Sequence, residues 1–370
     1  MYLDHAATTP MRAEAVAAYT AALTTVGNPS SIHSHGQEAR RMLEEAREQV
    51  AAALGVDAIQ VTFTSGGTES INLALKGLFW QRAPRRRILS TRAEHHATID
   101  ALEWLQRHEG AVVDWIPVDD LGRIDLAALE AAMGDDVALV TTLLANNEVG
   151  TVQPVAEVLR IAGDVPVHVD AVGGWGNVPV PPGAAAVSVS AHKIGGPVGV
   201  GALVLRRDVT VMPLIHGGSQ QPSRSGTLDV AGAVAFAAAA ALPHDDLAPL
   251  RDRLIDGVRR TVPDAVLRGD PVHRLPGNAH FTFPGCEGDS LLFLLDAAGV
   301  SVSTGSACQA GVPEASHVLL AMGLDEPTAR GALRFTLGDG SAAADVDALL
   351  AALPAAVASA RRAGLVTPAR

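Results

Sequence analysis

Short apolar runs rich in β-branched residues alternate with stretches of helical period along the first two thirds of the chain. This alternation predicts a mostly parallel sheet covered by helices, because parallel strands need crossover connections that are usually helical. Seven runs are candidate strands: residues 60–64, 87–90, 112–117, 138–144, 165–170, 184–190 and 201–206. We therefore expect an α/β fold with a seven-stranded, mostly parallel sheet.

A second, smaller unit is predicted after the polar break at residues 243–246. Its expected strands are 278–283 and 331–337, and its expected helices start near Leu247 and cover 289–298, 316–322 and 345–353. Helices of the first unit are expected at 37–54, 98–107 and 155–162, with one opening at Ile71. We expect a large domain over 15–245, a small α+β domain over 246–370 joined by residues 1–14, and a frayed tail from about Arg361.

Charge and cysteine content exclude several classes of protein. The formal net charge of −12 disfavours nucleic acid as a partner, because a polyanion would meet a repulsive surface. The two cysteines, Cys286 and Cys308, exclude a disulfide framework and a Cys-rich metal site. The start of the chain lacks the pattern of a signal peptide, and the apolar run 230–242 is short for a membrane span. We expect a cytoplasmic protein.

Ligands of open parallel sheets bind beyond the carboxyl ends of the strands, so residues after each strand are the first candidates. The turn Ser65-Gly66-Gly67-Thr68-Glu69-Ser70 follows the first strand and opens a helix. Its glycines and free N–H groups can hold a phosphate, but a plain capping turn with Thr68 or Ser70 at the N-cap is an equal alternative.

Asp170 and Lys193 follow two other strands. A carboxylate at the tip of an apolar strand needs a cation or a protonated ring nitrogen, although Asp170 can also be a turn or N-cap residue. Lys193, in Ser190-Ala191-His192-Lys193, can serve as a Schiff-base amine if its pKa falls through burial. Most lysines are instead solvated surface cations.

Two further strand ends carry Glu94-His95-His96 and Asn146-Asn147-Glu148. His95 can stack on a planar cofactor and relay protons, whereas a His95–His96 metal site lacks a convincing third ligand. In the smaller unit, Arg334 lies inside an apolar strand and needs a carboxylate partner from the protein or from a substrate.

Cys308 lies in a long stretch of small residues between two predicted helices. Long irregular segments in compact domains are usually functional or disordered, and a cysteine there suits a nucleophile that must travel. Free cysteines are more often buried and inert, as Cys286 can be, but the composition favours a functional Cys308. Together these parts suit pyridoxal 5′-phosphate (PLP) held against an amino acid, with a sulfur acceptor nearby.

The sequence resembles the NifS/IscS-type cysteine desulfurases, which are class V aminotransferases of PLP fold type I, from Tyr2 to about Gly338. The resemblance rests on seven motifs: Gly27-Asn28-Pro29-Ser30-Ser31, Thr64-Ser65-Gly66-Gly67-Thr68-Glu69-Ser70, Asn146-Asn147-Glu148, His168-Val169-Asp170-Ala171, His192-Lys193, Arg224-Ser225-Gly226-Thr227 and Gly305-Ser306-Ala307-Cys308. An aspartate-aminotransferase-like fold is implied.

The resemblance also implies residue roles. Lys193 would bind PLP covalently, Asp170 would pair with the pyridine nitrogen and His95 would stack on the ring and relay protons. The implied phosphate ligands are Gly67, Thr68, Ser190, His192 and, from the second subunit of a homodimer, Thr227. Asn147, beside the cofactor, and Arg334 would hold the substrate carboxylate side.

The activity implied by the resemblance converts L-cysteine to L-alanine and leaves the sulfur as a persulfide on Cys308. An acceptor protein, such as an iron–sulfur scaffold or a tRNA-thiolation protein, would then take that sulfur. Two alternatives stay open: a related PLP enzyme with a changed substrate, such as a selenocysteine lyase or an epimerase, and a weakly active scaffold subunit.

Two departures from the family pattern motivate these alternatives. Gly173 stands where the family normally has a glutamine that bonds the cofactor's phenolic oxygen. The glycine-rich run before Arg224, residues 217–223, is altered and one residue shorter.

Overall fold

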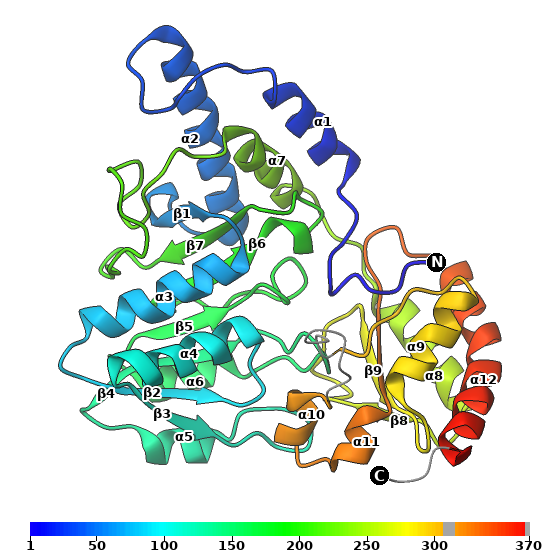
Figure 1. The fold of residues 1–370 in the computed structure, drawn as a ribbon. Helices are drawn as coiled ribbons and strands as arrows, with labels where there is room; N and C mark the ends of the chain where they lie inside the picture. The colour runs from blue at the N-terminus through cyan, green and yellow to red at the C-terminus, as the bar shows by residue number, and fades with distance from the viewer. Residues whose placement is uncertain (306–314, 367–370) are drawn as a thin grey trace.

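The computed structural model describes residues 1–305 and 315–366 of the chain. Within them, the larger of two sheets has the order β1-β7-β6-β5-β4-β2-β3 (Figure 1). Its strands are β1 (Val61–Thr64), β2 (Arg87–Thr91), β3 (Val112–Ile116), β4 (Val137–Leu143), β5 (Val167–Asp170), β6 (Ala186–Ser190) and β7 (Gly201–Leu205). Only β7 runs antiparallel to its neighbours. The expected mostly parallel, seven-stranded sheet is confirmed, and every expected strand overlaps an observed one.

Helices cover both faces of this sheet. On one face, α3 (Gly67–Gln81) and α4 (His96–Glu109) bury Leu75 and Leu102 against alternate strand residues such as Leu139. The opposite face is covered by α2 (Ser34–Leu54), α5 (Leu126–Ala132), α6 (Val155–Ala162) and α7 (Val230–Ala240). Because both faces are covered, the strands other than the edge strand β3 are buried along nearly their whole length, as parallel sheets usually are.

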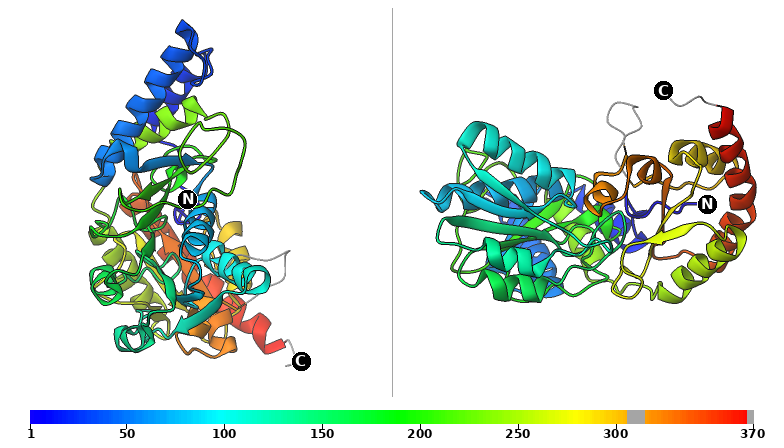
Figure 2. Two further views of the ribbon diagram at one scale, coloured as in Figure 1. Left: turned by 90° about the vertical axis from the view of Figure 1, so that its left-hand side faces the viewer. Right: turned by 90° about the horizontal axis from the view of Figure 1, so that it is seen from below.

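Four helices of this unit differ from the sequence prediction. Helices α1 (Ala13–Ala22), α5 and α7 were not predicted, and α3 begins at Gly67 rather than at Ile71. Helix α7 shows no apolar stripe in the sequence because it is apolar on all sides. Helices α1 and α2 both pack on it and bury most of its alanines. Helices α1 and α2 extend beyond the sheet, whereas α7 lies against it (Figure 2).

The smaller unit contains an antiparallel sheet of order β10-β9-β8, formed by β8 (Val266–Arg268), β9 (Asn278–Thr282) and β10 (Ala332–Thr336). Its helices are α8 (Ala248–Thr261), α9 (Gly288–Ala297), α10 (His317–Ala321), α11 (Glu326–Arg330) and α12 (Ala343–Val366). Two short 3-10 turns, Ala58–Gln60 and Ala191–Lys193, complete the fold. The domain boundaries 1–14, 15–245 and 246–370 stay predictions.

The carboxyl-terminal helix is longer than predicted. Helix α12 continues through Pro354 to Val366, so the expected end at residue 353 is wrong. The chain is helical from Arg361 to Val366, where a frayed tail was expected, and the rest of that tail, 367–370, lies outside the described residues. Val357 and Ala360 extend the buried stripe of Leu353 beyond the proline, and this burial offsets the hydrogen bond that proline cannot make. The segment Ala343–Ala363 is long and apolar enough to span a membrane, but it packs on α8 and α9 as a core helix.

Leu3 links the first residues of the chain to the smaller unit. Its side chain is fully buried among Phe281, Phe335 and other residues of that core, and Tyr2 and Asp4 form bridges with Ser301 and Thr336. The amino terminus is therefore a structural part of the smaller unit.

We predict that Leu3→Ala lowers the free energy of unfolding by about 2–5 kcal/mol, because it opens a cavity in this core. Chemical denaturation followed by circular dichroism measures the loss. Phe293→Ala is the control, because Phe293 lies on a helix of the same unit and is 77% exposed. Equal losses in the two variants would contradict the packing described here.

Candidate functional site

A pocket lies between the two units, beyond the carboxyl ends of the large sheet's parallel strands. It is lined by the amino-terminal segment, the large unit and strand β10 of the smaller unit. Most of the predicted site residues line it: Gly67, Thr68, His95, Asn147, Asp170, His192, Lys193 and Arg334. The fold therefore gathers side chains that are up to 267 residues apart in sequence, from Gly67 to Arg334.

The turn after β1 is open toward the pocket. Helix α3 has Gly66 at its N-cap, with φ of 147° and no side-chain cap, so the alternative with Thr68 or Ser70 at the N-cap is wrong. Ser70 instead hydrogen-bonds Thr64, with 2.7 Å between the hydroxyl oxygens. A Cβ at Gly67 would lie 2.6 Å from Val172, so glycine permits the close packing here. The helix start can receive an anion.

His192 lines the pocket, whereas Ser190, at the end of β6, is absent from the pocket lining. The Ser190 hydroxyl is buried and has no hydrogen-bond partner among the described residues. His192 lies by the amino-terminal segment, with its Nδ1 3.1 Å from the Thr8 hydroxyl. Thr227 is exposed and is absent from the pocket lining, so the described chain does not bring it to this site.

Lys193 is enclosed rather than solvated. Its Nζ donates hydrogen bonds to the backbone carbonyls of Ala6 and, at 2.9 Å, Ala7. Burial, and then the charge of Arg334, lower the pKa of Lys193 to about 8. The surface-cation alternative is therefore wrong, and an appreciable fraction of the amine is neutral near neutral pH.

Asp170 lies at the end of β5 and is only 2% exposed. Its Oδ1 accepts the Val172 N–H at 2.9 Å. One of its two carboxylate oxygens therefore makes the hydrogen bond that is expected of a turn residue. Burial raises the pKa of Asp170 to about 6 despite this bond and the charge of Lys193. A cation in the pocket would therefore be stabilised by this carboxylate.

His95 lies at the start of α4 and opens onto the pocket. Its Nδ1 accepts the Ala97 N–H at 3.1 Å, which leaves Nε2 as the protonated nitrogen of the neutral ring. Desolvation by the pocket walls, and then the charge of Lys193, lower the pKa of His95 to about 4. His96 turns away to His317, with 4.5 Å between the ring centroids. Among the described residues, no three potential ligands gather around a metal position.

Arg334 has a carboxylate partner within the protein. Its Nη2 donates to Asp4 Oδ1 at 2.9 Å, and its Nη1 donates to the backbone carbonyl of Asn147 at 2.8 Å. Its buried Nε has no partner among the described residues. Asp4 therefore holds the guanidinium at the pocket wall, beside Asn147.

The described residues include Cys286 but not Cys308. Cys308 lies outside the described residues, but Ser303 and Gly305, which precede it, line the pocket. Cys286 is 6% exposed in the core of the smaller unit, and burial raises the pKa of its thiol. Cys286 is therefore a structural residue, as the sequence analysis considered.

Gly173 also lines the pocket. A Cβ there would meet only ordinary contacts, the nearest being the Ala145 carbonyl oxygen and Asn147 Cβ at 3.6 Å. Glycine at this position is therefore not needed to avoid a steric clash, and it leaves room beside the pocket.

Sequence reasoning missed part of the pocket. His5, Ala6 and Ala7 line it, as do His244 and Asp339, which hydrogen-bond at 2.8 Å between Nδ1 and Oδ2. The motif Asp4-His5-Ala6-Ala7 was visible but was not given a role. Nothing in the sequence pairs His244 with Asp339, because their contact is across the two units.

Comparisons with known proteins show the family to which the chain belongs. The model of the family "Aminotransferase class-V" matches residues 1–349. An IscS-like cysteine desulfurase of Mycobacterium tuberculosis is 54% identical over 385 residues, covering 98% of both chains. The cysteine desulfurase IscS of Dictyoglomus turgidum is 43% identical, covering 91% of this chain and 89% of the relative.

Solved structures show the same fold. A NifS-like protein superposes with a TM-score of 0.89 at 35% identity, covering 97% of this chain and 99% of the other. DndA from Streptomyces lividans superposes with a TM-score of 0.77 at 34% identity, covering 92% and 100%. On sequence and fold, this chain belongs to the class-V aminotransferase family and, within it, to the IscS/NifS-like cysteine desulfurases.

Proposed function

We propose that this cysteine desulfurase uses PLP and Cys308 to move sulfur from L-cysteine to an acceptor protein, with L-alanine as the other product. The observation that carries the proposal is the convergence of Lys193, Asp170, His95 and Arg334 on one pocket. These four groups come from four separate parts of the chain, so their meeting requires the whole fold.

The residues present fit PLP. The open start of α3 at Gly67 and Thr68, the unpartnered Ser190 hydroxyl and His192 would hold the phosphate. Asp170 would pair with the ring nitrogen, since its buried carboxylate is stabilised by a cation. His95 would stack on the ring, and Lys193 would bind the cofactor covalently. When bound, PLP supplies an electron sink for the carbanion formed at the substrate.

The chain's own residues would then position the substrate and move protons. The neutral Nζ of Lys193 can take the α-proton of cysteine, and His95 Nε2 faces the same pocket as a proton donor. Arg334 and Asn147 would hold the substrate carboxylate. The Cys308 thiolate would attack the substrate sulfur, forming an S–S bond as the Cβ–S bond breaks and the alanine carbon takes a proton.

We further propose that the enzyme is a cytoplasmic homodimer in which Thr227 of each copy completes the phosphate site of the other. Thr227 is exposed and outside its own pocket, which supports such a role. The projection of α1 and α2 also exposes Leu23, Val26 and Ile32, with Ile32 92% exposed. Burying these side chains against a second copy would stabilise the pair.

The persulfide route predicts that L-cysteine yields equal amounts of sulfide and alanine in the presence of excess thiol reductant. Cys308→Ala should abolish both products, because no acceptor then exists for the sulfur. Cys286→Ala is the control and should keep the activity, because Cys286 is buried away from the pocket. Products that persist in Cys308→Ala would favour a lyase such as the selenocysteine enzymes, and no products from the native chain would favour the scaffold alternative.

The lowered pKa of Lys193 predicts how the cofactor-free protein captures PLP. Only the neutral amine reacts with an aldehyde, so the capture rate should rise with pH and level off above about 8 rather than above 10.5. Stopped-flow absorbance of PLP mixed with the cofactor-free protein measures the rate. Lys193→Ala should show no capture, and a rate still rising steeply at pH 10 would exclude the lowered pKa.

Gly173→Gln should slow the loss of PLP during dialysis, because a side chain fits there and its amide can donate to the phenolic oxygen. Gly173→Met adds similar bulk without the amide and serves as the control. Unchanged retention in Gly173→Gln, or an equal gain in both variants, would remove the hydrogen bond as the explanation.

A further inference from the structure

Glu148 is a buried carboxylate to which the proposed function gives no task. It follows Asn147 in the loop after β4 and is 2% exposed. A buried charge is costly unless it is paired or hydrogen-bonded, so its partners indicate what it stabilises.

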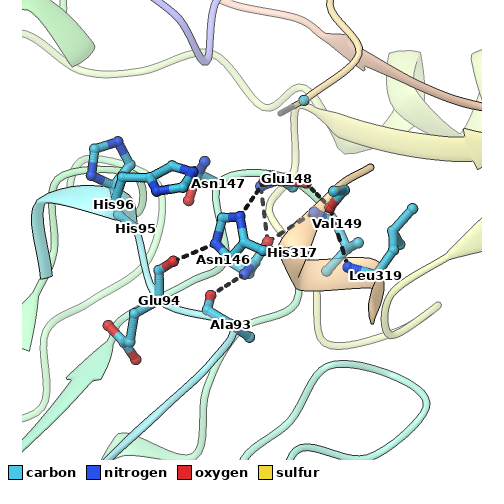
Figure 3. Close-up of polar contacts among 12 residues, drawn as sticks. Ala93, Glu94, His95, His96, Asn146, Asn147, Glu148, Val149, His317 and Leu319 are labelled. Atoms are coloured by element: carbon cyan, nitrogen blue, oxygen red, sulfur yellow. Dashed lines mark hydrogen bonds and ion pairs between the residues drawn. The ribbon is translucent and has the colours of Figure 1, made fainter. Parts of the chain in front are cut away.

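The loop that carries Glu148 is held from several sides. The Asn146 side chain accepts the N–H groups of Glu148 and Val149, each at 2.9 Å, and donates to the Ala93 carbonyl at 2.9 Å. Asn278 of β9 donates to the Glu148 carbonyl at 3.0 Å. Figure 3 shows this loop beside His95 and the start of α10. The carboxylate of Glu148 is therefore presented from a rigid base.

Both oxygens of that carboxylate lie against the start of α10, and Oε1 is 3.9 Å from His317 Nδ1. Glu148 Oε2 accepts a hydrogen bond from the Ser316 hydroxyl, and the same Ser316 oxygen caps α10 by accepting the Leu319 N–H at 3.1 Å. His317 adds a second tie, because its Nε2 lies 2.8 Å from the Glu94 carbonyl, which can only accept a hydrogen bond. The start of α10 is thus bound to the wall of the pocket.

The same oxygen also flanks Gly305. A Cβ on Gly305 would lie 3.4 Å from Glu148 Oε2 and 3.4 Å from His280 Nε2, and the residue has a φ of +86°. Gly305 therefore lies near two buried polar side chains of different units, in a conformation that favours glycine.

Gly305 precedes residues 306–314, and Ser316 lies two residues after them. A single carboxylate therefore hydrogen-bonds the chain on one side of the stretch that contains Cys308 and lies near the chain on the other side. Its neighbour Asn147 lines the pocket and is bonded through its carbonyl to Arg334.

We propose that Glu148 is a positioning residue for sulfur transfer. Through its hydrogen bond to Ser316, and from its place beside Gly305, it sets the position of the described ends of the Cys308 segment relative to Asn147 and Arg334. The inference rests on the proposed function, because it assigns Glu148 to the step in which Cys308 takes the sulfur. Cysteine binding itself depends on other residues and does not require Glu148.

The test compares two rates in holoenzyme variants. Affinity for L-cysteine is measured by the change in cofactor absorbance on binding, and persulfide formation on Cys308 is measured by rapid quench and mass spectrometry in a single turnover. Glu148→Gln weakens the charge-assisted bond to Ser316, and Ser316→Ala removes it. Each should slow persulfide formation roughly 10-fold to 100-fold while leaving cysteine affinity unchanged, as expected for a small misplacement of a reacting group.

Two control variants separate positioning from simple loss of structure. Asp325→Ala removes the N-cap of the neighbouring short helix α11, where Asp325 accepts the Thr328 N–H at 2.8 Å, without touching Glu148. It should leave persulfide formation unchanged. Ser316→Thr keeps the hydroxyl and should restore the rate that Ser316→Ala loses.

Three results would overturn the inference. Persulfide formation at the native rate in Glu148→Gln and Ser316→Ala would do so, as would a parallel fall in cysteine affinity. An equal slowing in Asp325→Ala would assign the effect to helix capping. A native enzyme that binds cysteine but forms no persulfide would instead overturn the proposed function, and the inference with it.

Discussion

Residues 2–9 join the two units, and the pocket depends on how they do so. Leu3 is buried in the core of the smaller unit, and the Asp4 carboxylate pairs with Arg334 at 2.9 Å. A few residues later, the carbonyls of Ala6 and Ala7 accept hydrogen bonds from Lys193 of the large unit. One short segment of chain, with a turn at residues 5–7, therefore links the lysine of the large unit to the guanidinium of the smaller unit.

Behind the pocket, buried polar groups fix the strand ends that carry the reactive side chains. His168 bridges three adjacent strands, with its ring nitrogens 2.9 Å from the hydroxyls of Thr141 and Ser188. Glu94 is buried next to His95, and burial together with the charge of Asp170 raises its pKa well above the usual range. A neutral Glu94 leaves Asp170 as the carboxylate that faces a cation. The site is thus rigid and weakly solvated, which suits shifted pKa values.

Much of the secondary structure of the large unit could be predicted, because the sequence patterns that indicate its strands are local. All seven strands overlap their expected ranges, since each is a short apolar run between polar turns. Helix α7 was missed because its alanine-rich sequence has no periodicity, and the length of α12 was underestimated because a proline normally argues for an end. In both cases, burial by distant elements outweighed the local preference.

The candidate site, too, could be predicted only in part from the sequence. The residue types after each strand were readable, because parallel strands place their carboxyl ends at one edge of the sheet. Sequence could not pair Arg334 with Asp4, His244 with Asp339 or Glu148 with Ser316, since these partners are 330, 95 and 168 residues apart. The sequence by itself determined the strands, the turn glycines and the reactive side chains, which depend on local conformation and chemistry. Only the tertiary structure decided which of them meet, how far each is removed from water and therefore how its pKa shifts, because those properties depend on the packing of two units against each other.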